Sequence, residues 1–370
     1  MKKNLLREIN NNEGANKDNK KVAILFGGCS SEYNVSLQSA YSVIKHINRD
    51  KYDVVLIGIT RDGEWYLFED NIERIKDDTW QEVCSKKVTI SVSREDHGII
   101  IFESDKVEKV RLDAVYPVLH GKNGEDGTIQ GLCELAGIPV IGCDMLSSAL
   151  CMDKQLAHDV VAKIGVKVPR GIVLEGKIDE ENVLEKIKGL KFPLYIKPMR
   201  AGSSFGITKV EDISEVENAI LLALKHDSTV IIEENIDGFE VGCAILGNGQ
   251  DLIIGKVDEI ELSDGFFDFT EKYTLKSSKI HMPARIDEEL EERVKLEAIK
   301  IYNALKCKNF ARVDMFITPN NEIVFNEVNT IPGCTTHSRY PNMLKGIGIE
   351  FGDFINKAIG MVIDDESYTR

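Results

Sequence analysis

The chain has 370 residues, 43% of them hydrophobic, which is enough for two or three domains with substantial cores. Its formal net charge of −15 argues against nucleic acid or an anionic membrane surface as a partner. The eight cysteines follow no disulfide or metal-ligand spacing, and no apolar run reaches the ~18 residues of a membrane span. We therefore expect a cytoplasmic protein that holds any anionic ligand with local lysines, arginines and metal ions.

The amino-terminal part alternates strand, glycine turn and helix after a tail over residues 1–19 that we expect to be disordered. Lys20 to Phe26 predicts a strand that is followed by a glycine turn and a helix. The pattern recurs as a strand from Asp113 to Leu119, a loop, and a helix from Thr128 to Ala136. This alternation predicts an α/β domain over residues 20–143 with a parallel, doubly wound sheet.

The remaining sequence predicts two further units that mix helices with short strands, so the fold class is α/β with α+β character in part. A helical segment from Ser147 to Gly165 opens a central domain, expected over residues 144–235. The carboxy-terminal domain, residues 236–370, is expected to contain a strand from Leu252 to Asp258, a mobile loop and a hairpin.

The hairpin over residues 311–333 carries the most specific pattern of the chain. Its Asn-Asn pair at 320–321 predicts a two-residue turn, and residues whose numbers sum to 641 then face each other. That register sets Asp314 opposite Glu327, and Arg312 opposite Asn329, on one face of the hairpin. Opposed carboxylates cost stability unless a cation lies between them, and carboxylate and amide oxygens suit Mg²⁺. The alternative is a solvent-facing polar side.

Two lysines have positions that suit phosphate binding. Lys197 ends an apolar strand and is followed by a Gly-Ser loop at 202–206 whose backbone N–H groups could cover phosphates. Lys154 lies in the first turn of a helix, where the helix dipole disfavours a cation unless an anion is bound nearby. Taken singly, an ordinary flexible turn explains the Gly-Ser loop at least as well, and a solvated surface lysine explains Lys154 better.

Two carboxylates and one histidine also lie at strand ends. Glu233 ends an apolar strand and Glu240 follows a glycine turn, so they could bind a base amine and ribose hydroxyls. His120 follows an apolar strand, at the edge where open α/β sheets bind ligands. Acidic residues are abundant here and loop histidines are common, so none of these residues decides a function alone.

The ordered set of motifs resembles the D-alanine:D-alanine ligases of the ATP-grasp superfamily, from Lys20 to the carboxy terminus. The motifs are Gly-Gly-x-Ser-x-Glu at 27–32, His-Gly-x-x-Gly-Glu-Asp-Gly at 120–127, Met-Asp-Lys at 152–154, Gly-Ser-Ser-x-Gly at 202–206, Glu-Lys-Tyr at 271–273, Arg-x-Asp at 312–314 and Glu-x-Asn-Thr-x-Pro-Gly at 327–333. As a set they are far more specific than any one of them. The resemblance implies the ATP-grasp fold and a homodimer.

The resemblance also implies roles for individual residues. The residues implied to bind ATP are Lys154, Lys197, Ser204, Glu233 and Glu240. Those implied to hold magnesium, generally two ions with Mn²⁺ as a substitute, are Asp314, Glu327 and Asn329. Those implied to act in catalysis are Glu32, Ser203, Tyr273, Arg312 and Gly333. Those implied to bind the D-amino acids, which are D-alanine and a second substrate, are His120, Lys272, Ser338 and Arg339.

Ser-Arg-Tyr-Pro at 338–341 resembles the corresponding sequence of the vancomycin-resistance ligases. The vancomycin-resistance ligases that make D-alanyl-D-lactate replace Glu-Lys-Tyr in the mobile loop, whereas this chain keeps it at 271–273. The combination resembles the D-alanine:D-serine ligases of the VanG type, and we expect Arg339 to bond the serine hydroxyl. Alternatively, Arg339 pairs with a surface acid. The alternative functions are a housekeeping D-alanine:D-alanine ligase and a non-catalytic ATP or amino-acid sensor on the same fold. Glu234 stands where many housekeeping ligases have lysine.

Overall fold

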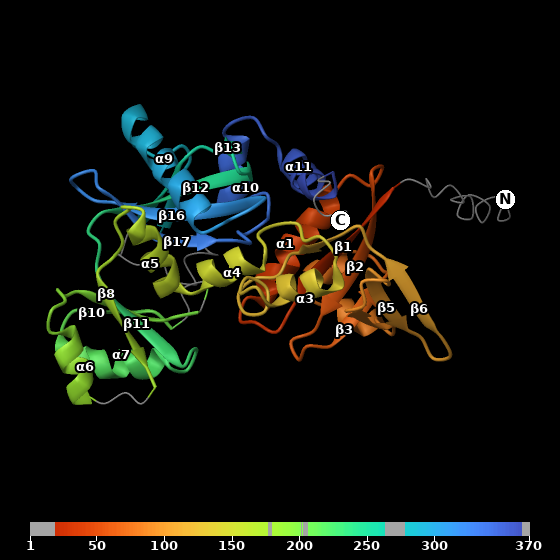
Figure 1. The fold of residues 1–370 in the computed structure, drawn as a ribbon, viewed down its shortest axis with the longest axis horizontal. Helices are drawn as coiled ribbons and strands as arrows, with labels where there is room; N and C mark the ends of the chain where they lie inside the picture. The colour runs from red at the N-terminus through yellow and green to blue at the C-terminus, as the bar shows by residue number, and fades with distance from the viewer. Residues whose placement is uncertain (1–18, 177–179, 201, 203–205, 263–277, 365–370) are drawn as a thin grey trace.

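The structure is a computed structural model that describes residues 19–176, 180–200, 202, 206–262 and 278–364, arranged around three β-sheets (Figure 1). Each of the three units expected from the sequence contains one sheet, while the boundaries between the units remain predictions. Within the described ranges, no helix combines the length and the apolar character that a membrane span needs.

The amino-terminal sheet has the strand order β6-β5-β4-β3-β2-β1-β7. Its strands are β1 (Lys20–Gly27), β2 (Tyr52–Ile59), β3 (Trp65–Phe68), β4 (Lys87–Ile90), β5 (Gly98–Phe102), β6 (Val107–Arg111) and β7 (Ala114–Pro117). Parallel pairing joins β1 to β7, the two strands named in the sequence analysis, and also joins β1 to β2, whereas β2 to β6 form an antiparallel meander. The predicted parallel arrangement therefore describes one part of a mixed sheet.

Helices cover both faces of this sheet because side chains along a strand alternate between its faces. Val22 and Ile24 of β1 pack in one core with α1, whereas Ala23 and Leu25 pack in a second core with α3. The helices of this unit are α1 (Tyr33–His46), α2 (Glu73–Lys76), the 3₁₀ helix η1 (Trp80–Val83) and α3 (Thr128–Ala136). The sheet is therefore the middle layer of three.

Two helices replace the single one expected between Ser147 and Gly165. They are α4 (Met145–Met152) and α5 (Lys154–Lys163). In Figure 1, α4 lies toward the amino-terminal unit, whereas α5 lies between the central and carboxy-terminal sheets. The break falls at Asp153, whose extended backbone (φ −87°, ψ 102°) lets its side chain accept a hydrogen bond from the Leu156 N–H. Asp153 thus ends one helix and caps the next.

The central sheet is antiparallel, with the order β10-β9-β11-β8. Its elements are β8 (Gly171–Glu175), α6 (Glu180–Ile187), β9 (Leu194–Pro198), β10 (Thr208–Val210), η2 (Ile213–Glu215), α7 (Val216–Ala223) and β11 (Thr229–Glu234). Alternation puts Leu194 and Ile196 of β9 into a core with α6 and α7. Lys197 on β9 and Glu233 on β11 consequently occupy the opposite face.

The carboxy-terminal sheet has the order β15-β14-β12-β16-β17, with β13 paired to β12. Its strands are β12 (Phe239–Asn248), β13 (Asp251–Ile254), β14 (Asp258–Leu262), β15 (Ser278–His281), β16 (Phe310–Ile317) and β17 (Ile323–Asn329). The single strand expected from Leu252 to Asp258 is wrong. The chain leaves the ladder at Lys256, whose N–H donates to the Met343 carbonyl at 3.0 Å, and this contact separates β13 from β14.

The last helices connect the carboxy-terminal sheet to the amino-terminal one. The helices of this unit are α9 (Glu288–Ala304), α10 (Arg339–Lys345) and α11 (Phe351–Ile363). Helix α9 packs on one face of the sheet, whereas α11 contacts α1, β7 and β12. Phe310 of β16 contacts Tyr116 of β7 and Phe354 of α11, with ring centroids 6.1 and 5.4 Å apart. One apolar core therefore spans both units.

We expect Gly58→Ala to destabilise the fold, because a Cβ on Gly58 would lie 2.3 Å from the ring of fully buried Trp80. Overpacking of this kind costs about 1–3 kcal/mol. Gly360→Ala on α11 is the matched control, since its Cβ would meet one side-chain atom at an ordinary 3.5 Å. Urea unfolding measures both, and equal stability of the two variants would contradict the Trp80 packing.

Candidate active site

The β16–β17 hairpin has the pairing predicted from the sequence. Arg312 lies opposite Asn329, and Asp314 lies opposite Glu327. The four side chains share the face turned away from α9, because the intervening Val313 belongs to the core on the other side. The hairpin therefore presents two opposed carboxylates, one amide and one guanidinium at one end of the sheet.

The predicted two-residue turn is wrong, although the pairs it predicted are correct. Thr318 and Glu322 close a three-residue loop at 319–321, whose last residue, Asn321, has a left-handed φ of 56°. This loop shifts the pairing near the turn by one residue. A β-bulge beside the Asp314–Glu327 pair, with Asn326 as the extra residue of β17, shifts it back.

Asp314 is almost fully buried, with 1% of its surface exposed, and it lies among hydrogen-bond donors. Arg312 donates to both of its oxygens at 2.8 and 2.7 Å, and the Asn329 amide donates at 2.9 Å. Burial lowers the pKa of Arg312, but the adjacent Asp314 carboxylate outweighs this effect and holds that pKa above its usual value. Arg312 is therefore a charged and rigidly held donor.

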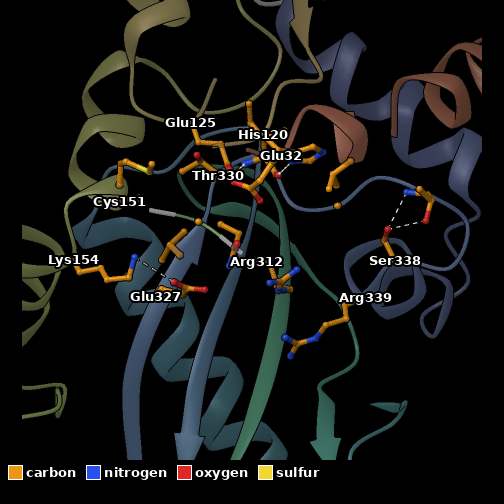
Figure 2. A pocket seen from close by; sticks show the side chains of 18 of the residues that line it. Glu32, His120, Glu125, Cys151, Lys154, Arg312, Glu327, Thr330, Ser338 and Arg339 are labelled. Atoms are coloured by element: carbon orange, nitrogen blue, oxygen red, sulfur yellow. Dashed lines mark hydrogen bonds and ion pairs between the residues drawn. The ribbon is translucent and has the colours of Figure 1, made fainter. Parts of the chain in front are cut away.

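The residues expected to hold magnesium fit that ion. Asp314 and Glu327 supply opposed carboxylates, and Asn329, which uses its nitrogen on Asp314, keeps its Oδ1 for a cation. Oxygen donors of this kind are the ones that Mg²⁺ prefers. Lys154, the first residue of α5, points toward the same place, and its Nζ lies 3.9 Å from Glu327 Oε2 (Figure 2).

Lys197 and Glu233 form a buried ion pair on neighbouring strands, with Nζ and Oε2 2.6 Å apart. Burial alone would lower the pKa of Lys197 and raise that of Glu233. The attraction between the two opposite charges has the contrary effect on both pKa values and outweighs burial. The pKa of Lys197 therefore lies above its usual value and that of Glu233 below it. Both side chains are charged at neutral pH.

Glu32 and two glycines lie at the opposite end of the site. Glu32 directly precedes α1, and its carboxylate lies against both glycines. A Cβ added to Gly121 or to Gly202 would lie only 2.5 Å from Oε2 of Glu32, so neither position has room for a side chain. Gly121 has a left-handed φ of 71° as well. Glu32 is 6% exposed, so these glycines bring the amino-terminal and central units together around one buried carboxylate.

His120 is engaged through both of its ring nitrogens. Its Nδ1 must donate to the Ile331 carbonyl at 3.0 Å, because that oxygen only accepts. Nε2 consequently accepts from the Ser39 hydroxyl at 2.9 Å, and Ser39 Oγ in turn accepts from the Cys334 N–H at 3.3 Å. Burial lowers the pKa of His120 to about 4, so the ring is neutral. In this arrangement it holds the turn that contains Gly333.

Glu125 is a site residue that the sequence analysis missed, although it lies within the quoted His-Gly motif. Its two oxygens accept from the N–H groups of Gly121 and Ile331 at 2.9 and 3.0 Å. Burial first, and the charge of Glu32 second, raise its pKa to about 8. The only available signal was a carboxylate inside a glycine-rich loop after a strand.

Arg339 is 9% exposed and surrounded by carboxylates. Its Nε and Nη2 donate to Asp258 at 2.8 and 2.7 Å, and its Nη1 donates to Glu240 at 2.9 Å and lies 3.6 Å from Asp314. Arg339 thus pairs with acids, as in the alternative, but they are strand residues that are buried (Asp258) or half-buried (Glu240) and not exposed surface acids. Asp258 was not predicted, because nothing in the sequence links it to a residue 81 positions away.

A cavity of about 280 Å³ lies among several of these groups (Figure 2). Nine predicted site residues line it: Glu32, His120, Lys154, Arg312, Glu327, Asn329, Gly333, Ser338 and Arg339. Asp314 lies behind Arg312, and the predicted nucleotide residues Lys197, Glu233 and Glu240 lie outside the lining of this cavity. Four predicted residues fall outside the described ranges: Ser203, Ser204, Lys272 and Tyr273.

Two family models match the chain. The D-ala D-ala ligase N-terminus model matches residues 21–143, and the D-ala D-ala ligase C-terminus model matches residues 160–360. The solved VanG D-Ala:D-Ser ligase from Enterococcus faecalis is 57% identical, covers 93% of this chain and 99% of its own, and has a TM-score of 0.86.

Two relatives compared by sequence are a vancomycin-resistance protein and a D-alanine–D-alanine ligase. The vancomycin B-type resistance protein VanB from Enterococcus faecalis is 43% identical over 93% of this chain and 98% of its own length. A D-alanine–D-alanine ligase from Acetivibrio thermocellus is 40% identical over 94% of this chain and 96% of its own length.

These likenesses confirm the ATP-grasp fold, and with the charged cavity they define an ATP-dependent ligase that forms peptide bonds. The chain belongs to the D-alanine:D-alanine ligase family.

We expect Glu125→Gln to flatten the pH dependence of stability. Because the pKa of Glu125 rises from 4.5 to about 8 on folding, the folded chain holds a proton that the unfolded chain releases in that range. The unfolding free energy therefore falls as pH rises through this window, by up to about 1.4 kcal/mol per pH unit. Urea unfolding at several pH values measures the slope. Exposed Glu134→Gln is the control, and an unchanged slope in Glu125→Gln would contradict the assignment.

Proposed function

We propose that the chain joins D-alanine to D-serine with ATP. The carboxylate of the first D-alanine takes the γ-phosphoryl group, the amine of the second substrate attacks the acyl phosphate, and phosphate leaves. The product would be a modified peptidoglycan precursor terminus that confers vancomycin resistance, made in the cytoplasm by a homodimer. The 57% identity to the VanG D-Ala:D-Ser ligase, and Arg339 at the cavity wall, support this substrate pair.

In this proposal the nucleotide lies between the central and carboxy-terminal sheets. Lys154 and Lys197 bind its phosphates, and Glu240 binds the ribose. The adenine amine donates to Oε1 of Glu233, which accepts no hydrogen bond from any described residue, while Oε2 stays with Lys197. Magnesium held by Asp314, Glu327 and Asn329 would neutralise phosphate charge.

The remaining residues act on the amino acids. Glu32 binds the first ammonium group, Ser338 binds the second carboxylate, and Arg312 with the Gly333 N–H stabilises the oxyanion. Arg312 suits this role because two hydrogen bonds to Asp314 fix its guanidinium before any charge develops. The reaction then depends on positioning and charge stabilisation, with no covalent enzyme intermediate.

Arg339 carries the preference for D-serine. Its guanidinium group is fixed by two hydrogen bonds to Asp258. The side chain lines the cavity, as does that of Ser338, the preceding residue in the sequence. Serine's hydroxyl can accept from a guanidinium and donate to a carboxylate, whereas a methyl group can do neither. The rival substrate is D-alanine at both sites. Two observations favour this rival. The donors of Arg339 already bind carboxylates, and the relative from Acetivibrio thermocellus is a D-alanine–D-alanine ligase.

The metal assignment predicts that Glu327→Gln and Asp314→Asn each slow ligation by at least about a hundredfold, roughly 3 kcal/mol. Each change removes an anionic oxygen and leaves the side-chain volume almost unchanged. Glu322→Gln is the control, because this exposed residue of the same hairpin pairs with Lys167 beside the turn. Phosphate release and dipeptide formation are measured together. Normal turnover by either site variant would eliminate the opposed-carboxylate metal site.

The specificity assignment predicts that Arg339→Leu and Arg339→Lys lower the D-serine over D-alanine preference about tenfold or more, since a bond to a charged group contributes roughly 1.5–3 kcal/mol. Competition among D-serine, D-alanine and D-lactate, with all products quantified, gives a ratio that is independent of the amount of folded enzyme. This matters because Arg339→Leu leaves Asp258 buried and unpaired. Exposed Arg293→Leu is the control.

Two results would overturn the D-serine proposal and leave the ligase family untouched. One is a wild-type preference for D-alanine at the second site, which would establish the housekeeping reaction. The other is unchanged selectivity in both Arg339 variants, which would give this residue a purely structural part in the buried charge network.

A further inference from the structure

His158 is a buried side chain on α5 to which the proposed chemistry assigns no role. It lies one helical turn after Lys154, so both side chains project from the same face of α5. Its exposed fraction is 4%, and its ring meets the edge of Phe325 with centroids 5.5 Å apart. Packing explains the burial of the ring but not the polar groups that face its two nitrogens.

The first nitrogen contacts the metal hairpin. Nε2 of His158 lies 2.9 Å from the backbone oxygen of Asn326 and must donate to it, because a carbonyl oxygen only accepts. Asn326 is the extra residue of the β-bulge and directly precedes Glu327. Lys154, one turn earlier, reaches Glu327 itself. Helix α5 therefore contacts the bulge at two successive positions.

The second nitrogen contacts the predicted adenine-binding residue. Nδ1 of His158 lies 3.3 Å from Oε1 of Glu233, within ion-pair distance of this carboxylate. Glu233 is 2% exposed, and its other oxygen is bound to Lys197. Oε1 accepts no hydrogen bond from the described residues, so the ring and an incoming amine would share it.

We propose that His158 is a positioning residue that aligns the two ends of the nucleotide site. Through Nδ1 it orients Glu233 for the base, and through Nε2 it sets the spacing between α5, with Lys154, and the bulge that presents Glu327. The substrate class is an adenine nucleotide with its divalent cation. The inference rests on the proposed function for the roles of Glu233 and Glu327.

Two amide substitutions separate the two contacts, because their nitrogens occupy different places. The amide nitrogen that His158→Gln introduces approximates Nε2 and can donate to Asn326, whereas the one that His158→Asn introduces approximates Nδ1 and can reach Glu233. His46→Gln is the matched control. His46 also packs its ring against a phenylalanine, with centroids 5.0 Å apart, but it lies on α1 and contacts Phe351.

Calorimetric titration with ADP and with GDP, each with Mg²⁺, tests the base contact without requiring ligation. We expect His158→Gln to bind ADP about tenfold more weakly and to lose its preference for ADP over GDP. We expect His158→Asn to keep that preference but to need a severalfold higher Mg²⁺ concentration for half-maximal turnover. His46→Gln should match the wild type in both measurements.

Two outcomes overturn the inference. One is wild-type nucleotide preference and Mg²⁺ dependence in both His158 variants. The other is a lower melting temperature and less active enzyme with both quantities unchanged, which would make His158 a packing residue. Failure of the proposed function is recognised separately, because a wild-type protein that binds ADP but forms no dipeptide would disprove ligation and leave the titration result standing.

Discussion

The buried carboxylate of Asp314 is the charge around which the site is organised. A carboxylate with 1% exposure is stable only when donors surround it, and Arg312 and Asn329 supply three hydrogen bonds. Arg339 lies next in the network and is itself held by Asp258 and Glu240. Positive and negative groups therefore alternate from the hairpin to Asp258 on β14. Removal of Asp314 or Asp258 would take a principal partner from a buried guanidinium, so a substitution in this network is expected to change stability together with any role that the proposed function gives these residues.

The amino-terminal and carboxy-terminal units meet through two kinds of contact with different effects. The apolar core around Phe310 and α11 binds them without directional preference, whereas His120 and Glu125 hold the Ile331 backbone through directional hydrogen bonds. The first kind supplies cohesion. The second sets the position of the turn that carries Gly333 relative to Glu32, which is the spacing that a substrate between them would experience.

Local patterns predicted the elements that depend on neighbouring residues in the chain. The helix ended by Gly137 and the parallel arrangement of β1 and β7 follow from glycine turns and apolar runs. The bulge at Asn326 was not predictable, because the sequence pattern of a strand does not reveal an extra residue unless the position of the turn is already known. Asp258 was missed for a different reason: its partner lies on a distant helix, and sequence spacing carries no information about such contacts. Of the nine predicted residues around the cavity, Arg312, Glu327 and Asn329 followed from the hairpin register, and Lys154 and His120 from their positions at a helix start and a strand end. Glu32, Gly333, Ser338 and Arg339 were predicted only through the family resemblance.

The pairing of Lys197 with Glu233 has a consequence for the energetics of turnover. In the proposed function this lysine keeps its partner 2.6 Å away while it binds a phosphate, so part of its charge is neutralised before the nucleotide arrives. Lys197 then contributes less to nucleotide affinity than a fully available cation would, and we expect that affinity to be moderate. Moderate affinity favours a catalyst that must discharge its spent nucleotide in every cycle, since equal strengthening of all bound states would only slow that discharge.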